Sequence, residues 1–257
     1  MPRIIAIANQ KGGVGKTTTT VNLAAGLARA RQRVLLIDLD PQGNATTGSG
    51  IDKRAVNIST LEVLTGAAPV VDSRRSVPAG YDVLPANADL TAAKVLLLQV
   101  DRREFRLRDA LAAVADDYHY VLIDCPPALD MLTVNALTAA GSVLIPMQCE
   151  YYALEGLSDI LDTIADIAAS ANPGLHVEGV LRSMFDPRSR LARDVSEQLQ
   201  SHFGERVYRT VIPRNVRVAE APSHGQPVLD YDRGCVGTTA FLTLAGEMLR
   251  RHHLKAT

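Results

Sequence analysis

The chain has 257 residues, 47% of them hydrophobic and 21% charged, with a formal net charge of −1 at pH 7. This length and composition predict one large α/β domain over residues 1–257 and exclude an extensively disordered chain. A nearly neutral protein does not attract nucleic acid as a whole, so any such binding requires a local patch of charge.

We expect neither a membrane-spanning segment nor a leader segment. No apolar run approaches the length that crosses a bilayer, and the N-terminus enters a strand pattern almost at once. The cysteines Cys125, Cys149 and Cys235 form no Cys-x-x-Cys pair, so neither a disulfide framework nor a zinc site is indicated. We therefore expect a cytoplasmic protein without stable membrane association.

The first predicted elements surround a glycine-rich loop. Residues 4–8 form an apolar run typical of a buried strand, and residues 21–28 have the spacing of a helix. Backbone N–H groups in such a loop and the positive end of the helix dipole face the same polyphosphate. We expect Lys16 to contact the terminal phosphates and the Thr17 hydroxyl to bind Mg²⁺, whereas a plain strand-to-helix turn is the alternative. The predicted phosphate-binding residues are Lys11, Gly12, Gly13, Val14, Gly15, Lys16, Thr17 and Thr18.

This loop differs from the usual nucleotide-binding loop at its start. Gln10 stands where a glycine is usual, and a second lysine, Lys11, follows it. The sequence Lys-Gly-Gly-x-Gly-Lys-Thr resembles the deviant Walker A loop of the family that includes the ParA/Soj partition ATPases, the MinD ATPases and the nitrogenase iron protein. From its residue type alone, Lys11 is a solvated surface lysine. The resemblance implies instead that Lys11 crosses a dimer interface to the partner's nucleotide and, like Lys16, takes part in catalysis.

Two carboxylates follow the next apolar run, residues 34–37, which fits a parallel strand covered on both faces. The carboxyl end of such a strand lies beside the nucleotide crevice, although an Asp-Pro pair is also typical of a solvated turn. The stretch Asp-x-Asp-Pro-Gln-Gly-Asn resembles the ParA/Soj switch segment. This resemblance implies that Asp40 is catalytic, positions the attacking water and lies near the metal, with Asp38 as a supporting carboxylate on the metal side.

A third apolar run, residues 120–123, ends at Asp124. A carboxylate at the end of a buried strand near Thr17 can bind Mg²⁺ through water, whereas an aspartate that only ends the strand is the alternative. The match to the family's Ile-Asp-x-Pro-Pro pattern favours the metal. The predicted metal residues are therefore Thr17, Asp40 and Asp124.

Further elements continue the alternation of strands and helices. A capping box at residues 59–62 begins a short helix that ends near Gly66. Residues 81–85 and 142–146 have strand patterns, and residues 154–171 form a long helix. This alternation predicts a doubly wound, mostly parallel sheet of the P-loop NTPase type, with nucleotide at the carboxyl ends of the strands.

The charge balance changes over residues 182–217, which contain eight arginines and four acidic residues, a net charge of +4. Sequence-independent binding to a phosphate backbone requires such a patch, although arginine-rich surface helices are common. The resemblance to ParA/Soj proteins implies that Arg188 and Arg217 hold DNA, with Arg190 and Arg214 as weaker candidates.

The same resemblance places Pro213 and Asn215 around the adenine ring. The carboxamide of Asn215 offers both a donor and an acceptor to the edge of a base, so its chemistry suits that role.

The resemblance to the ParA/Soj family covers essentially the full chain. It implies an ATPase for chromosome or plasmid partition, with ATP and Mg²⁺ as cofactors. It further implies that ATP binding produces a sandwich homodimer, which binds DNA nonspecifically and associates with the nucleoid. A ParB-type centromere-binding protein is then expected to stimulate hydrolysis and release.

Two rival classes share this loop. A MinD-like membrane-associated ATPase needs a C-terminal amphipathic helix with bulky apolar residues, whereas residues 248–255 are a short and weakly apolar stretch. An electron carrier like the nitrogenase iron protein needs cysteine ligands for an iron–sulfur cluster, and the cysteine pattern offers no convincing pair. We therefore favour the partition ATPase, with the MinD-like protein as the alternative.

Overall fold

The computed structural model of the protein describes residues 2–254. Its centre is an eight-stranded sheet with the strand order β3-β4-β2-β5-β1-β6-β7-β8. Neighbouring strands are parallel except β3 and β4, which are antiparallel. The prediction of a mostly parallel sheet is therefore confirmed. The strands are β1 (Arg3–Ile7), β2 (Val34–Asp38), β3 (Arg75–Ser76), β4 (Asp82–Leu84), β5 (Tyr120–Asp124), β6 (Ser142–Gln148), β7 (His176–Phe185) and β8 (Val207–Pro213).

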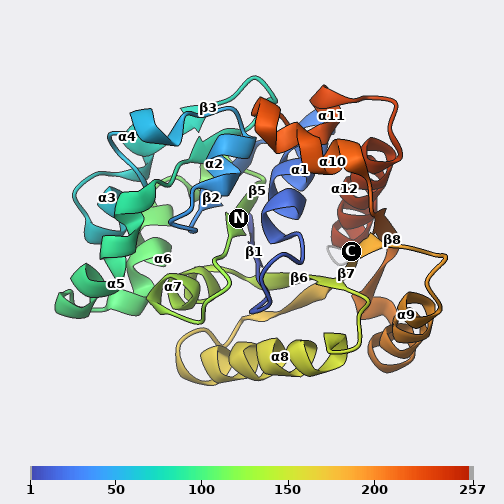
Figure 1. Ribbon diagram of the computed structural model, residues 1–257. Coiled ribbons are helices and arrows are strands. Elements are labelled where there is room, and N and C mark those ends of the chain that lie inside the picture. Colours follow the sequence, from blue (N-terminus) through green and yellow to red (C-terminus); the bar gives the residue numbers. More distant parts are fainter. Residues whose placement is uncertain (1, 255–257) are drawn as a thin grey trace.

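Helices cover both faces of this sheet (Figure 1). In that view α1 and α12 lie above β6 and β7, and α8 lies below them. The helices are α1 (Lys16–Arg29), α2 (Asn44–Gly48), α3 (Thr60–Thr65), α4 (Val70–Ser73), α5 (Ala93–Leu96), α6 (Arg106–Leu111), α7 (Met131–Ala139), α8 (Ala153–Ser170), α9 (Arg190–Phe203), α10 (Val216–Glu220), α11 (Val228–Tyr231) and α12 (Val236–Leu254).

Side chains along each strand alternate between the two faces. Ile5 and Ile7 of β1 join an apolar cluster with α1 and α12, whereas Ala6 and Ala8 join a second cluster with α7, α8 and α9. Because both faces are buried, the central strands are continuous apolar runs and do not alternate between apolar and polar residues.

The last residues of the central strands β1, β5 and β2 lie side by side. Ile7 of β1 pairs with Asp124 of β5, and Asp124 pairs with Asp38 of β2. Since these strands are parallel, the glycine-rich loop after β1 and both carboxylates lie at the same end of the sheet. Ligands of open α/β sheets bind at this end.

Local predictions about α3 are confirmed. The Ser59 hydroxyl accepts a hydrogen bond from the Leu61 N–H (3.1 Å), and Glu62 accepts one from the Ser59 N–H (2.7 Å). The helix ends at Gly66, whose φ of 81° lies in the left-handed region. The capping box and the terminal glycine thus define this short helix.

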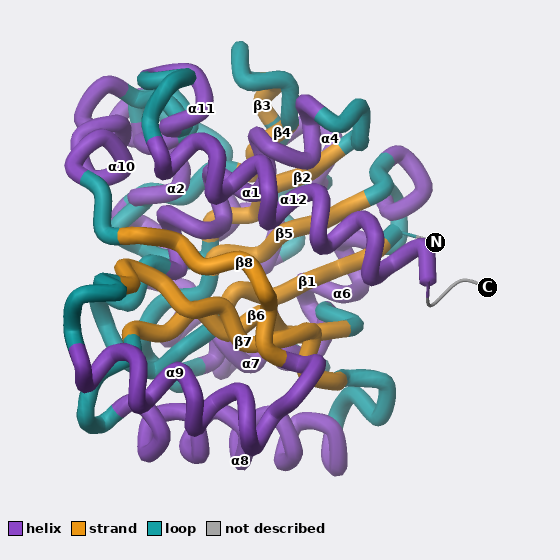
Figure 2. The backbone as a smooth tube through the Cα atoms, turned by 90° about the vertical axis from the view of Figure 1, so that its right-hand side faces the viewer, coloured by secondary structure: helices purple, strands orange, loops and turns teal. Residues whose placement is uncertain are grey.

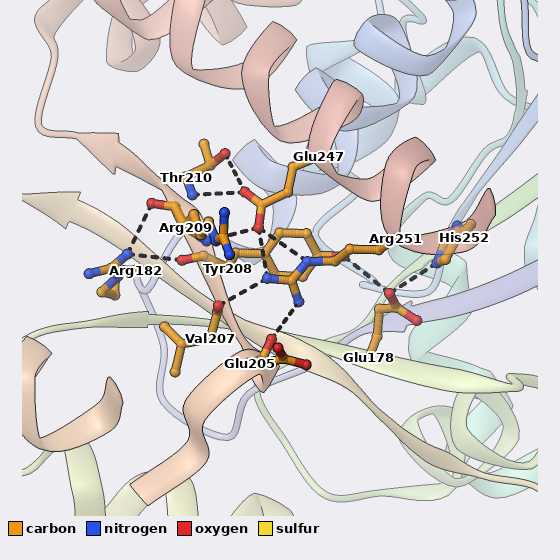
Figure 3. A network of polar contacts seen from close by, with 10 residues as sticks. All are labelled: Glu178, Arg182, Glu205, Val207, Tyr208, Arg209, Thr210, Glu247, Arg251 and His252. Carbon is orange, nitrogen blue, oxygen red and sulfur yellow. Dashed lines mark hydrogen bonds and ion pairs between the residues drawn. The ribbon is translucent and has the colours of Figure 1, made fainter. Parts of the chain in front are cut away.

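Helix α12 closes the edge of the sheet at β8. Glu247 accepts hydrogen bonds from the backbone N–H groups of Arg209 (2.9 Å) and Thr210 (2.8 Å). One turn later, Arg251 donates to the carbonyl oxygen of Val207 (3.0 Å) and pairs with Glu247 (2.7 Å). Figure 3 shows both side chains between α12 and β8. Since β8 is the edge strand of the sheet, backbone groups on its outer side form hydrogen bonds with side chains of α12.

The end of α12 packs into the molecule. Met248 is fully buried, and His252, 4% exposed, lies 2.9 Å from Glu178 between Nε2 and Oε1. The segment that the sequence marks as weakly apolar thus turns two side chains, Met248 and His252, into the core, while its last residue, Lys255, lies outside the described residues. Over residues 2–254, no helix combines the length and apolarity needed to cross a bilayer.

Candidate functional site

The glycine-rich loop joins the end of β1 to the start of α1. Gly13 and Gly15 have φ values of 73° and 88°, in the region that glycine adopts without steric cost. Gly15 directly precedes α1, no side chain caps this helix end, and its first turn contains no acidic residue. The first N–H groups and the positive dipole end of α1 thus form an anion site without a competing carboxylate.

Lys16 lies inside this loop. Its side chain is buried, and Nζ donates a hydrogen bond to the carbonyl oxygen of Lys11 at 3.2 Å. Burial lowers the pKa of Lys16, while the nearby Asp124 carboxylate opposes the shift. The ammonium group therefore spans the loop at the position where a bound phosphate needs a positive charge.

Asp124 faces the first turns of α1 from the end of β5. Its two oxygens accept hydrogen bonds from the hydroxyls of Thr17 (2.7 Å) and Thr20 (3.0 Å). Burial, and then the neighbouring Asp38 carboxylate, raise the pKa of Asp124 to about 8. Thr20 was not among the predicted site residues, although a position three residues after Thr17 places both hydroxyls on one helix face.

This group of oxygens fits a magnesium ion. Hydroxyl and carboxylate oxygens are the donors that Mg²⁺ prefers, and a bound cation would relieve the cost of burying the Asp124 charge. Within residues 2–254, no three His, Cys, Asp or Glu side chains gather as a complete metal site. An ion here would take its remaining ligands from phosphate and water, which is usual for Mg²⁺ bound with a nucleotide.

Asp38 is buried and holds the loop after β2. Its Oδ1 accepts a hydrogen bond from the Asp40 N–H (3.1 Å), and its Oδ2 accepts from the N–H (2.8 Å) and hydroxyl (2.7 Å) of Thr46. Burial raises the pKa of Asp38 to about 6. Both oxygens of Asp38 therefore hold α2 and the loop that precedes it, and its expected supporting role on the metal side stays a prediction.

Asp40 has a different environment. It is partly exposed, and its Oδ1 accepts one hydrogen bond, from the Gln42 N–H at 2.9 Å. Asp38 thus anchors the segment, while Asp40 extends from it at the carboxyl end of the sheet.

Lys11 points away from the loop that contains it. Its Nζ lies 2.7 Å from Oε2 of Glu150, just after β6, and both side chains are about half exposed. Its backbone N–H donates to the side chain of Asn9 at 2.9 Å. In this conformation the Lys11 ammonium lies at the surface, where a second molecule can reach it.

Pro213 ends β8, and Asn215 directly precedes α10. The Asn215 side-chain oxygen accepts a hydrogen bond from the Val218 N–H at 3.2 Å and so caps the helix. The carboxamide oxygen is thereby engaged, and the amide N–H groups remain as the donors of this side chain.

The two predicted DNA-binding arginines follow neighbouring strand ends. Phe185 of β7 pairs with Pro213 of β8; Arg188 follows the first strand and Arg217 the second. Figure 2 shows both connections leaving the same end of the sheet, toward α9 and α10. The side chain of Arg188 is 89% exposed.

Acidic neighbours bind both arginines in this structure. Arg188 pairs with Asp186 (2.9 Å), and Arg217 pairs with Glu220 (2.8 Å) and Asp232 (3.5 Å). The Arg188 guanidinium lowers the pKa of Asp186 to about 2. A phosphate group therefore has to compete with these carboxylates, although exposed pairs of this kind exchange readily.

One arginine of the positively charged segment lies inside the protein. Arg182 is 5% exposed and donates to the hydroxyl of Ser196 (2.8 Å) and the carbonyl oxygen of Tyr208 (2.9 Å). Its inclusion in a surface patch was therefore wrong, because charge counted along the sequence does not show which side chains a strand turns inward.

A glycine loop between a parallel strand and a helix, with a lysine inside it and a threonine–aspartate pair at its base, defines a phosphate-loop nucleotide-binding protein. A family model described as "AAA domain" matches residues 2–177. The chain is 53% identical to the chromosome partitioning protein ParA of Caulobacter vibrioides over 97% of this chain and 94% of the relative. It is 51% identical to the sporulation initiation inhibitor protein Soj of Bacillus subtilis over 96% and 98%. The chain belongs to the ParA/Soj family of partition ATPases, which confirms the predicted family and enzyme class.

A solved structure agrees with this assignment. The cobyrinic acid a,c-diamide synthase of Mycobacterium smegmatis, solved with bound ADP and magnesium, is 38% identical, has a TM-score of 0.87 and covers 98% of this chain and 96% of its own. Its ligands agree with the predicted cofactors, ATP and Mg²⁺. That synthase is named for a different reaction, so the likeness supports the fold and nucleotide chemistry, whereas ParA and Soj carry the partition assignment.

Proposed function

We propose that this partition ATPase binds DNA nonspecifically as an ATP-bound homodimer and is released when a ParB-type partner stimulates hydrolysis. One observation carries the proposal: the phosphate loop and the exposed arginines Arg188 and Arg217 lie at the same end of one parallel sheet. A change at the nucleotide and a change at the DNA-binding loops can therefore affect the same surface. This cycle would place the protein on the nucleoid.

The nucleotide is proposed to bind across the loop of residues 11–18. Backbone N–H groups and Lys16 hold the phosphates, Thr17 and Asp124 hold Mg²⁺, and Pro213 and Asn215 border the adenine. Bound Mg²⁺ supplies charge neutralisation between the phosphate oxygens. The hydrogen-bonded pair of Thr17 and Asp124 supports this assignment, because both oxygens already face one position.

Asp40 is proposed to orient the water that attacks the terminal phosphate and to lie beside the metal ion. Its partial exposure and single backbone hydrogen bond leave the carboxylate able to accept a proton from water. Asp38 fixes the segment, so that Asp40 is placed by a buried anchor.

Lys11 is proposed to reach the nucleotide of the second subunit. Its half-exposed side chain and its pairing with Glu150 at 2.7 Å support this role, because a surface ion pair is easily exchanged for a phosphate contact. Both active sites of a dimer would then be complete only when the subunits meet.

DNA binding is expected to depend on dimerisation because a dimer makes more phosphate contacts than one subunit does. One subunit neutralises few phosphates, and affinity for DNA grows with each counterion released. Doubling the patch in a dimer turns weak contact into useful affinity. Nucleotide would thus control DNA binding without touching DNA.

The experiment compares DNA retention with ATP, with ADP and without nucleotide over a range of salt concentrations. The variant Arg188→Ala/Arg217→Ala should still bind ATP and dimerise, but should bind DNA of any sequence more weakly. Its salt dependence should flatten by about 3.6 in slope, since four arginines per dimer are lost and each phosphate contact contributes roughly 0.9.

Arg102→Ala/Arg108→Ala is the charge-matched control, because both of these arginines are exposed and pair with Asp109 instead of following β7 or β8. This control should retain DNA as the parent does. Equal affinity for DNA with and without ATP, or strong preference for one sequence, would contradict the proposal.

The MinD-like alternative has less support. In the segment of residues 248–255 that a membrane anchor would need, Met248 and His252 are buried in the protein and so are withheld from a bilayer. Pelleting with liposomes tests this directly, and ATP-dependent pelleting would favour the alternative over the DNA-binding cycle.

A further inference from the structure

Two side chains hold the phosphate loop from outside. Ser183, near the end of β7, donates from its hydroxyl to the carbonyl oxygen of Val14 at 2.7 Å. Gln148, the last residue of β6, donates from Nε2 to the carbonyl oxygen of Gly13 at 3.0 Å. Ser183 is only 3% exposed, so water competes little for its bond. Two successive carbonyl groups of the loop are thus held toward β6 and β7.

The direction of these carbonyl groups sets the direction of the N–H groups in the same peptides. A trans peptide is planar, so its C=O and N–H bonds point in opposite directions. With the carbonyls of Gly13 and Val14 held toward β6 and β7, the N–H groups of Val14 and Gly15 point away from those strands. Inward-facing N–H groups are what a phosphate-binding loop needs.

Met184 adds a third contact at the same place. It has a φ of 48°, which is uncommon for a residue other than glycine, and its sulfur accepts a hydrogen bond from Gln148 at 3.2 Å. A Cβ added to Gly15 would lie 3.6 Å from the Met184 methyl carbon and 3.7 Å from the Ser183 Cβ. The end of β7 therefore packs against Gly15 and also donates a hydrogen bond to the carbonyl oxygen of the preceding residue, Val14.

We propose that Ser183 and Gln148 are positioning residues for the ATPase reaction, which keep the phosphate loop in its anion-binding shape before nucleotide arrives. A glycine-rich backbone loses much conformational freedom when it becomes ordered. Because the fold orders this loop in advance, nucleotide binding does not carry that loss, and affinity is higher. Both side chains act through the loop backbone.

Nucleotide titration of Ser183→Ala and Gln148→Met tests this role. Each variant should bind ADP and a slowly hydrolysed ATP analogue about tenfold more weakly, which corresponds to roughly 1.4 kcal/mol. The KM for ATP should rise by a similar factor while kcat stays near the parent value. Ser183→Thr keeps a hydroxyl and should recover most of the affinity.

Ser73→Ala is the matched control. Ser73 is fully buried in α4, and its hydroxyl donates to the carbonyl oxygen of Pro69 at 2.8 Å, so it makes the same kind of bond in another part of the chain. Its loss should lower the unfolding temperature but leave nucleotide affinity unchanged. This separates a contribution to stability from a contribution to loop shape.

Three results would overturn the proposal. The first is a folded Ser183→Ala that binds both nucleotides as the parent does. The second is an equal loss of affinity in Ser73→Ala. The third is weaker binding of the ATP analogue with normal binding of ADP, because such a selective loss would place the effect in dimerisation or hydrolysis and not in the shape of the loop. If Ser183→Ala does not fold, unchanged affinity in Gln148→Met decides against the proposal.

Discussion

Asp124→Asn should make the nucleotide-free protein more stable at alkaline pH and at the same time abolish Mg²⁺-dependent nucleotide binding. Asp124 is fully buried beside Asp38, and its nearest polar partners are the hydroxyls of Thr17 and Thr20. An asparagine keeps the shape and avoids the buried charge, but it cannot provide a carboxylate for the metal.

The size of the effect follows from the change in pKa on folding. The ordinary pKa of an aspartate is 3.8, and burial raises that of Asp124 to about 8. Between these values the folded state keeps a proton that the unfolded state has released, so stability falls as pH rises, by at most about 1.4 kcal/mol per pH unit. The pKa of Asp38 is raised only to about 6. From pH 6 to pH 8 the loss should therefore come mainly from Asp124 and amount to about 2 kcal/mol.

Urea unfolding of the nucleotide-free protein at pH 6 and pH 8 measures this loss. Over this interval the free energy of unfolding should fall by about 2 kcal/mol more in the parent than in Asp124→Asn. Asp116→Asn removes an exposed carboxylate and should follow the parent. Added Mg²⁺ and ATP at 100 times Kd should stabilise the parent by about 2.7 kcal/mol but not Asp124→Asn. The same pH dependence in the parent and Asp124→Asn would refute this explanation.

Three further variants separate nucleotide binding, hydrolysis and dimerisation. Lys16→Ala should weaken ATP binding by at least about tenfold in a calorimetric titration, because a charged hydrogen bond of roughly 1.5–3 kcal/mol is lost; near-normal affinity in a folded protein would contradict the loop assignment. Asp40→Ala should bind ATP and dimerise but hydrolyse it about 10²–10⁴-fold more slowly; partner-stimulated turnover equal to the parent's would exclude Asp40 as the catalytic residue. Lys11→Ala should lower the dimer fraction seen by light scattering with an ATP analogue more than it lowers monomer affinity. Its thermal unfolding should change little, since a half-exposed ion pair contributes about 0–1 kcal/mol; an unchanged dimer fraction would return Lys11 to the role of a surface lysine.

The sequence predicts features that depend on neighbouring residues. The capping box of α3 is complete within residues 59–62, so no distant contact is needed to recognise it. The glycine loop is equally local, because its strand, turn and helix follow each other directly. The pairing of Asp124 with Thr17 was predictable only because sheets of this type bring their strand ends together.

Features that depend on packing were not predictable from the sequence. Arg182 counts as surface charge in the sequence, but β7 turns it toward Ser196 and β8. Asp38 is a carboxylate at a strand end in the sequence, and only the structure shows that its hydrogen bonds to Thr46 anchor a loop. Neither a periodic pattern nor a charge count predicts the direction in which one side chain of a sheet points.

The contacts between α12 and β8 also limit the ways in which copies of this chain can meet. An uncovered edge strand invites another strand to pair with it, and such pairing can continue from copy to copy. Here Glu247 and Arg251 bind the backbone of the last strand, and the opposite edge, β3, is only two residues long. Open-ended stacking of sheets is therefore disfavoured at both edges. The proposed dimer would instead meet through the loops at the strand ends, so that association would stop at two copies and would depend on the supply of nucleotide.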